Sequence, residues 1–293
     1  MTRVMKHAML ESDMSRRLAL SLAASLLAVL PLASTPARAA DAAASVAPAA
    51  VPGSTHAEGP KEIRRTREGR PDFSGFWSLS RKQHPVDAGL VARLPPGAVL
   101  LDDTGAAEFP PGEFGGLKVK PAAMAAAKQW KPQDDMTVSR ACLPPSIVYA
   151  TQGPFPFQIH QGADLIVFQY EYFDLVRIIF MDGRPHPPPD APHSKVGHSV
   201  GHWEDNELVI DTTHLSAATI TNNGLSHSDN VHVMERFKLS ADGRTLQSTM
   251  WFEDPEVLDT RGARYIQWTL EPGQYVFPYE CDPTFGSKYS EAR

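Results

Sequence analysis

Cysteine is scarce in this chain, and the spacings that mark the common cysteine chemistries are missing. Cys142 and Cys281 are the only cysteines among 293 residues, and neither lies in a C-x-x-C pair. This argues against a thioredoxin-like redox motif and against a cysteine-rich zinc site. In an oxidising compartment two lone cysteines most simply form one disulfide, so we expect a Cys142–Cys281 bond. Two free buried thiols are the alternative.

Long apolar runs are also few. The main candidate, residues 18–32, follows Arg16 and Arg17, and it is shorter than the roughly 20 residues that a membrane span needs. Ala37-Arg-Ala39 then supplies an A-x-A cleavage site. This order is typical of a secretory signal peptide, residues 1–39, with a retained anchor as the alternative. We expect a soluble mature protein in the bacterial periplasm or outside the cell, with no stable membrane insertion.

Positive charge is in the minority. The chain has 28 lysines and arginines against 34 acidic residues, and removal of residues 1–39 takes away five basic and two acidic side chains. The remaining 23 basic and 32 acidic side chains include no basic run. An acidic surface of this kind argues against nucleic acids and anionic membranes as partners. The oligomeric state stays open.

Helical periodicity is nearly absent. Residues 40–70 are rich in alanine and proline and predict a disordered tether, which leaves 71–293 as a single domain. The many prolines of segment 81–141 indicate a loop-rich, partly helical insertion that acts as a lid or wrap. One helix is predicted at 121–130, because Pro121 suits the first helical position and Pro132 stops the helix.

Short strands rich in β-branched and aromatic residues dominate the rest of the chain. After a first strand that opens at Gly75, they are predicted at 157–161, 165–173, 175–181, 198–203, 207–213, 230–239, 245–252, 265–270 and 275–280. Almost no helix separates them, so we expect an all-β fold built as an antiparallel meander. Such a meander closes into an up-and-down barrel or stacks as a sandwich, and we favour the barrel.

Histidine is concentrated in one region: seven of the eleven histidines lie between residues 186 and 232. In the predicted hairpin of residues 198–213, with its turn at Asp205-Asn206, alternation places His198, His202 and Asp211 on one face. Trp203 and its apolar neighbours lie on the other face. Periodicity does not tell which face looks into the barrel, and a slip of one residue would exchange the two sets.

Two charged residues interrupt apolar rows. Glu235 shares a strand face with Val231, Val233 and other apolar residues, and Arg177 has a similar position in an earlier strand. A carboxylate in such a row is either paired with a buried cation or held at a raised pKa for chemistry. An Arg177–Glu235 ion pair across the barrel is the structural interpretation.

The segment 197–201 reads G-x-S-x-G, the nucleophile-elbow pattern of serine hydrolases. An elbow needs a helix directly after the serine, so that backbone amides form the oxyanion hole. Here a hairpin follows Ser199, and the hydrolase interpretation is therefore disfavoured.

A metal site is the second interpretation. His198 and His202 stand about 13 Å apart on a strand, at roughly 3.3 Å per residue, so one strand cannot bring both to one ion. No H-E-x-x-H or similar spacing is present. We predict no metal and no other cofactor, although histidines from several strands could still assemble a site.

A pocket for a small aromatic or lipid-like molecule is the third and favoured interpretation. A histidine beside an acid suits proton-transfer chemistry of the lyase or isomerase type, and a binding protein without turnover is the alternative. The predicted catalytic residues are His198, His227, Asp229 and Glu235. The predicted ligand-binding residues are Tyr172, Arg177, His186, His202, Asp211 and His232.

An ordered series of short motifs spans residues 71–282. They are Pro71-Asp-Phe-Ser-Gly-Phe-Trp77, Cys142-Leu-Pro-Pro145, Tyr170-Glu-Tyr-Phe173, Val176-Arg-Ile178, Asp182-Gly-Arg-Pro-His-Pro187, Gly197-His-Ser-Val-Gly201, Leu208-Val-Ile-Asp-Thr212, His227-Ser-Asp229 and Val233-Met-Glu-Arg-Phe237. The series resembles a large family of exported bacterial proteins, mostly described as hypothetical, with a lipocalin-like barrel. The resemblance implies that the segments around His186, His198, His227 and Glu235 belong to one shared site, and it brings no reaction with it.

Overall fold

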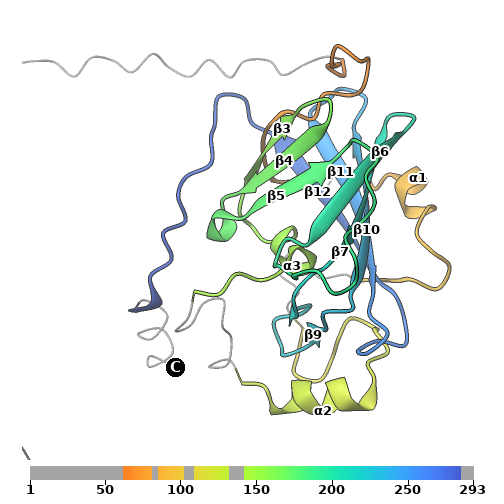
Figure 1. Ribbon diagram of the computed structural model, residues 1–293, viewed down its shortest axis with the longest axis vertical. Coiled ribbons are helices and arrows are strands. Elements are labelled where there is room, and N and C mark those ends of the chain that lie inside the picture. Colours follow the sequence, from red (N-terminus) through yellow and green to blue (C-terminus); the bar gives the residue numbers. More distant parts are fainter. Residues whose placement is uncertain (1–61, 81–84, 102–108, 132–141, 285–293) are drawn as a thin grey trace, which may run out of the picture. The chain divides into compact units, whose positions relative to one another are not determined.

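The computed structural model describes residues 62–80, 85–101, 109–131 and 142–284 (Figure 1). The predicted signal peptide and the predicted tether up to residue 61 lie outside these ranges. No helix within the described residues is long and apolar enough to cross a membrane.

Strands outnumber helices throughout the described chain. The helical elements are α1 (Ala88–Val91), α2 (Pro121–Gln129), α3 (Ile147–Ala150) and the 3₁₀ turn η2 (Tyr172–Asp174). The strands are β1 (Gly75–Leu79), β2 (Val99–Leu100), β3 (Phe157–Gln161), β4 (Leu165–Tyr170), β5 (Val176–Phe180), β6 (His198–Glu204), β7 (Glu207–Thr213), β8 (Ala218–Thr219), β9 (Ser226–His227), β10 (His232–Leu239), β11 (Thr245–Glu253) and β12 (Gly262–Leu270). The predicted helix at 121–130 is therefore confirmed as α2.

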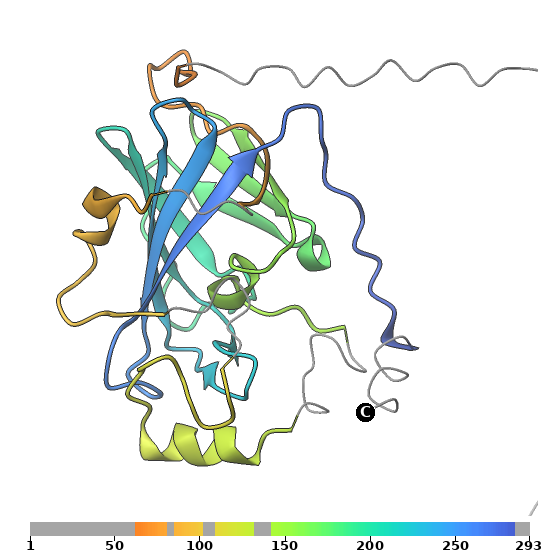
Figure 2. The ribbon, with the colours of Figure 1, turned by 180° about the vertical axis from the view of Figure 1, so that it is seen from behind.

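The sheet closes on itself. The strands are hydrogen-bonded in the order β1-β3-β4-β5-β6-β7-β10-β11-β12, and β1 also pairs with β12. Trp77, for example, faces Leu270 on β12 and Phe157 on β3. The described residues thus form a closed barrel of nine strands, which both views of the ribbon show (Figures 1 and 2). The prediction of an all-β barrel, rather than a sandwich, is confirmed.

The barrel is mixed, and the prediction of a purely antiparallel meander is wrong at one place. β5 and β6 run parallel, with Ile179 facing Ser199. Adjacent antiparallel strands can be joined by a tight turn, whereas parallel strands need a long crossover. The proline-rich loop of residues 181–197 provides that length and returns the chain to the end from which β5 began. The short β2 also pairs in parallel with β12.

The predicted strand at 275–280 is not a strand. Its backbone is held by side chains instead, since the Phe277 amide donates to Glu171 Oε2 at 3.2 Å and the Tyr279 amide donates to Asp174 Oδ1 at 3.0 Å. The predicted strand at 165–173 also ends early, because Phe173 has a left-handed φ of 56°. The two corrections are connected: the turn after β4 supplies the acceptors that hold the C-terminal segment.

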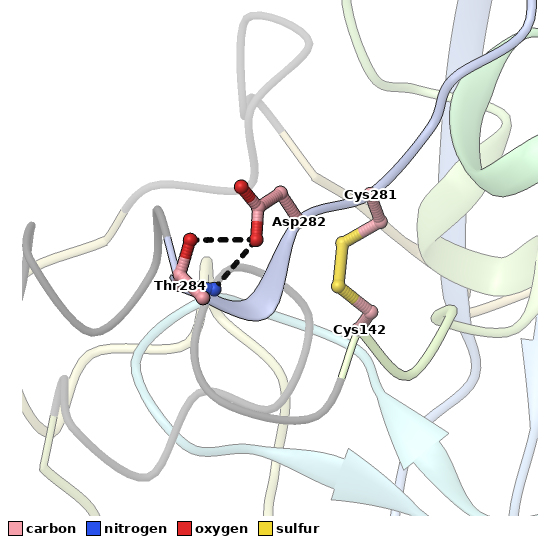
Figure 3. Close-up of a disulfide and its surroundings, with 4 residues drawn as sticks. All are labelled: Cys142, Cys281, Asp282 and Thr284. Carbon is pink, nitrogen blue, oxygen red and sulfur yellow. Dashed lines mark hydrogen bonds between the residues drawn. A yellow bond between two sulfur atoms is a disulfide. The ribbon is translucent and has the colours of Figure 1, made fainter. Parts of the chain in front are cut away.

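The predicted disulfide is present. Cys142 and Cys281 are bonded, with their Cα atoms 5.9 Å apart (Figure 3). The bond joins the C-terminal segment to the chain just before α3 across a sequence separation of 139 residues.

Two hydrophobic clusters fill the fold. The first lies inside the barrel, where rings from different strands meet: Phe157 contacts Trp268 at 5.2 Å, and Phe168 contacts Phe237 at 5.4 Å between ring centroids. The second combines residues of β10 and β11 with α3 and with the 81–141 insertion. Its members from the insertion are Leu101, Phe114, Leu117 and Ala127. The insertion is therefore packed against the barrel strands, as expected for a wrap.

The folded part begins before the predicted boundary at residue 71. Thr66 donates its amide to the Arg70 carbonyl at 2.8 Å, which closes a turn, and Ile63 packs against the first hydrophobic cluster. Arg65 Nη1 also donates to Asn206 Oδ1 at 3.1 Å on the β6–β7 turn. Residues 62–70, predicted as tether, are thus attached to the barrel.

Candidate functional site

The β6–β7 hairpin has the register expected from alternation. Trp203 faces Leu208, and Val200 faces Asp211. Ser199 and Leu208 are buried in the barrel, so the Trp203 set is the inner one. His198, His202 and Asp211 consequently lie on the outer face, which the sequence alone left open.

The ion pair between Arg177 and Glu235 is inside the barrel, as the structural interpretation expected. Arg177 Nη2 donates to Glu235 Oε2 and, at 2.8 Å, to Thr212 Oγ1. The two side chains are 0% and 1% exposed. Burial raises the pKa of Tyr170 beside them, with Glu235 adding to the effect and Arg177 opposing it, so the phenol stays neutral. A charge pair so enclosed is held by its partners rather than presented to solvent.

The glycines of the G-x-S-x-G segment have structural roles. Gly197 has a left-handed φ of +65°, and a Cβ on Gly201 would lie 2.7 Å from Ile179 Cγ2 on β5. Ser199 is buried, and its hydroxyl contacts Arg177 Nε at 3.0 Å and Thr212 Oγ1 at 2.9 Å. A turn and β7 follow it, and no helix does. The segment therefore lacks the geometry of a nucleophile elbow.

Five titratable side chains form a connected series outside the barrel, called here the outer histidine chain. His198 Nδ1 lies 3.0 Å from His186 Nδ1, and His186 Nε2 lies 3.3 Å from Asp211 Oδ1. The same carboxylate oxygen lies 2.7 Å from His232 Nε2. His232 Nδ1 is in turn 3.8 Å from Glu253 Oε1. Four of the predicted site residues, together with Glu253, thus meet in one place.

The register explains this meeting. His232 on β10 faces Glu253 on β11, and Asp211 on β7 faces Met234 on β10. Alternation sends all of these outward, because the residues between them fill the barrel. His186 comes from the proline-rich loop between β5 and β6, which crosses the outside of the barrel and brings an imidazole to β7.

The environment moves the pKa values of the two end histidines in opposite directions. The hydrogen bond to Asp211 raises the pKa of His232 against the opposing effect of burial. Burial lowers the pKa of His198, and the nearby His186, His214 and Arg184 lower it further. Burial alone would raise the pKa of Asp211, but the hydrogen bond from His232 outweighs it and the pKa falls. Groups whose pKa values are separated in this way suit the roles of acid and base.

Aromatic rings lie at both ends of the outer histidine chain. Trp251 on β11 meets the His232 ring edge-on, with centroids 5.6 Å apart and planes at 88°. Phe180 on β5 stacks with His198 at 5.2 Å, and the Arg184 guanidinium lies 3.8 Å from the Phe180 centroid. Each end of the chain thus has an apolar wall next to a titratable group.

A small cavity adjoins the His232 end, and we call it the Trp251 pocket. It has a volume of about 230 Å³ and is lined by Arg93, Pro95, Met234, Arg236, Thr249 and Trp251. Met234 faces Asp211 on one side and Trp251 on the other. The floor of the pocket is therefore the strand position next to the outer histidine chain.

His227 and Asp229 belong to a different region. His227 Nε2 lies 2.7 Å from Ser146 Oγ, and its Nδ1 donates to the Ser228 carbonyl at 2.8 Å. Burial lowers the pKa of His227. Asp229 accepts a hydrogen bond from the Ala217 amide. Both residues sit at the β8–β9 ribbon, which lies apart from the closed barrel sheet.

The predicted catalytic set His198, His227, Asp229 and Glu235 therefore does not converge. His198 is outside the barrel and Glu235 is inside it, because they occupy opposite faces of the same sheet. The side chains of His227 and Asp229 bond to other partners at the ribbon. The expectation of one site that contains all four is wrong.

Two predicted ligand-binding residues also lie apart from the outer histidine chain. His202 points outward but is 59% exposed near the hairpin turn, where its Nε2 lies 3.1 Å from Glu204 Oε1. Tyr172 lies in η2 and stacks on Phe155, with centroids 4.6 Å apart. Neither contacts the five residues of the chain in the described structure.

Sequence reasoning missed Glu253, Arg93 and Arg236. Glu253 could have been found from the register of β10 and β11, since it faces His232. Arg236 follows Glu235 on the opposite face, and its outward position was implied by alternation. Arg93 had no sequence signal, because it comes from the loop-rich insertion.

The described residues contain no group of three or more His, Cys, Asp or Glu side chains arranged to hold a metal ion. In the outer histidine chain, two imidazoles direct Nε2 toward the same carboxylate oxygen, which is a hydrogen-bonding arrangement. No protein-family model matches the chain, and no curated protein is significantly similar to it. The resemblance to the family of exported barrels stays a prediction.

Proposed function

We propose that this is an exported protein that binds a small organic molecule on the outer face of β7, β10 and β11 and transfers protons to and from it. The chemistry is non-redox and of the lyase or isomerase type. The observation that carries the proposal is the outer histidine chain, in which His232 and His198 have oppositely shifted pKa values and connect through His186 and Asp211.

The two ends have different roles in this proposal. His232 retains its proton to a higher pH than an ordinary histidine, because Asp211 stabilises the imidazolium, and it serves as the acid. His198 is neutral at neutral pH, because burial disfavours its charge, and it serves as the base. His186 lies between His198 and Asp211 and can pass a proton between them.

Accessibility favours the outer face over the barrel interior. The side chains of His186, His232 and Asp211 keep 22%, 31% and 35% of their surface exposed. Arg177 and Glu235 are sealed inside, and aromatic rings such as Phe157, Phe168 and Trp268 fill the space around the barrel axis. A substrate can reach the outer histidine chain without unpacking this core.

The Asp211→Asn variant tests the proposal. Loss of the carboxylate should lower the pKa of His232 toward the ordinary value and abolish turnover in screens of small organic acids, amides and alcohols. His160→Gln on the exposed side of β3 is the control and should change neither property. NMR titration of the histidine ring protons measures the pKa, and chromatography of the pooled compounds detects product.

The same variant should change the pH dependence of stability. A raised pKa means that protonated His232 stabilises the fold fully below the unfolded pKa of about 6.5, and that this contribution is lost as the pH rises through the folded pKa. The stability difference between wild type and Asp211→Asn should therefore shrink above neutral pH. An unchanged His232 pKa in the variant would contradict the proposed acid.

A binding protein without turnover is the second candidate, because the same pocket and charges also suit selective binding. It would be favoured if compounds bind with the same affinity to wild type and to Asp211→Asn while no pool yields product.

A further inference from the structure

We infer that the Trp251 pocket takes a small, flat, apolar carboxylic acid, with its carboxylate on Arg93 and Arg236 and its apolar body against Trp251. The inference rests on the proposed function, since it names the substrate class of that site. It narrows the expected ligand from aromatic or lipid-like molecules to one-ring acids and molecules of similar size.

The lining of the pocket has an unequal chemistry. Pro95, Met234 and Trp251 provide apolar surface, and Arg93, Arg236 and Thr249 provide N–H and O–H donors. No carboxylate is among the six lining residues. A ligand that satisfies this lining presents acceptor oxygens at one end and a hydrocarbon face at the other.

Two glutamates hold the arginines in position. Arg236 Nη1 lies 2.7 Å from Glu204 Oε2 and 3.4 Å from Glu207 Oε2. Arg93 Nη1 lies 3.3 Å and 3.6 Å from the same two oxygens. The hydrogen bond from Arg236 lowers the pKa of Glu204 to about 2, with His202 adding to the effect, so this clamp persists into acid solution.

Each guanidinium uses only Nη1 for the glutamates. The other N–H groups of Arg93 and Arg236 form no hydrogen bond within the described residues and remain available to a ligand. Because two arginines face two glutamates, the cluster has no net charge. Recognition therefore depends on directed N–H···O bonds, for which a guanidinium and a carboxylate are matched in shape.

The size of the pocket limits the ligand. Its volume of about 230 Å³ is below the roughly 300–1,000 Å³ of sites for drug-sized ligands. A single ring with a carboxylate fits such a space, and a long acyl chain does not. A ring placed on Trp251 also lies beside His232, whose imidazole meets the indole edge-on at 5.6 Å.

The test compares benzoate with benzamide, which has the same ring without the charge, on the full mature protein. Binding is measured by tryptophan fluorescence, with Trp251→Phe to assign the signal, and by calorimetry. Benzoate should bind roughly tenfold or more tightly than benzamide, the scale expected for one charge-assisted hydrogen bond.

Arg93→Gln is the informative variant, because Arg93 is 44% exposed and its replacement leaves the barrel core intact. It should weaken benzoate roughly tenfold and leave benzamide nearly unchanged. Arg70→Gln is the matched control, since Arg70 also lies over a tryptophan, 6.0 Å from the Trp203 ring, but away from the pocket. Melting temperatures confirm that both variants are folded.

The outcomes separate this inference from the proposed function. Equal affinities for benzoate and benzamide, no binding of either, or equal effects of Arg93→Gln and Arg70→Gln would overturn the carboxylic-acid class. If benzoate binds as expected while Asp211→Asn leaves the His232 pKa unchanged, the binding inference stands and the proton-transfer function falls.

Discussion

At the scale of single residues, the Arg177–Glu235 pair shows that a charge in an apolar row can be a matter of structure. Both side chains are buried, and the guanidinium also donates to Ser199 and Thr212. Such a pair fixes which residues of β5 and β10 face each other across the barrel. It contributes less to net stability than its contacts suggest, because both charges lost their water.

Glu235→Gln should destabilise the fold by about 3–5 kcal/mol, because it leaves Arg177 charged and uncompensated in the core. The double variant Arg177→Met with Glu235→Leu should lose much less, since it removes both charges together. Chemical denaturation followed by circular dichroism measures both. A double variant as unstable as the single one would show that the pair is worth more than its desolvation costs.

Residue positions could be predicted where alternation applies. The register of the β6–β7 hairpin, the inward position of Glu235 and its pairing with Arg177 all follow from a period of two. The face that looks inward could not be predicted for the hairpin, because both faces mix apolar and polar side chains. The partners of His186 could not be predicted either, since they depend on the path of a proline-rich loop.

At the scale of elements, the β5–β6 contact shows what the G-x-S-x-G segment does. Gly201 lies so close to β5 that a Cβ would be 2.6 Å from Met181 Sδ and 2.7 Å from Ile179 Cγ2. The parallel pair β5–β6 is the one junction between the barrel's two antiparallel runs in the described chain. The motif therefore marks a packing seam.

Gly201→Ala should cost about 1–3 kcal/mol, the usual range for overpacking a core. Gly153→Ala is the control, because a Cβ there would meet its nearest atom, the Ala150 carbonyl oxygen, at an ordinary 3.6 Å. Thermal denaturation compares the two. A Gly201→Ala protein as stable as the control would mean that β5 and β6 can separate without loss.

Element types were predictable, and element partners were less so. The sequence pattern at 275–280 suits a strand, but the barrel leaves it no partner: β1 pairs with Trp268–Leu270 of β12, and β2 pairs with Gly262 and Ala263. Propensity describes one segment, whereas pairing depends on which edges remain open. The parallel direction of β6 was hidden for the same reason.

At the scale of the whole molecule, the disulfide connects compartment and architecture. Cys142 and Cys281 tie the C-terminal segment to the chain before α3 (Figure 3). Disulfides persist in oxidising compartments, which supports the proposed export. Closing so long a loop stabilises the fold by roughly 4–5 kcal/mol at most in the chain-entropy account.

The exported protein should therefore begin at Ala40 and contain no free thiol, and reduction should lower its melting temperature. Mass spectrometry of protein recovered from the periplasm or medium, with and without reductant before alkylation, measures the first two properties. A retained leader would contradict the cleavage prediction, and two alkylated cysteines without reductant would contradict the bond in the native protein.

Barrel closure has a consequence for the order of events in this chain. The ladder between β1 and β12 joins the first and last strands of the barrel, so the barrel cannot close until residue 270 is available. A chain that emerges from its N-terminus, whether from a ribosome or from an export channel, presents an open sheet edge until its final strand arrives. Long-range pairing of this kind is also slow to form. Truncation anywhere before β12 would leave β1 without that partner, which makes the last barrel strand the one that completes the fold.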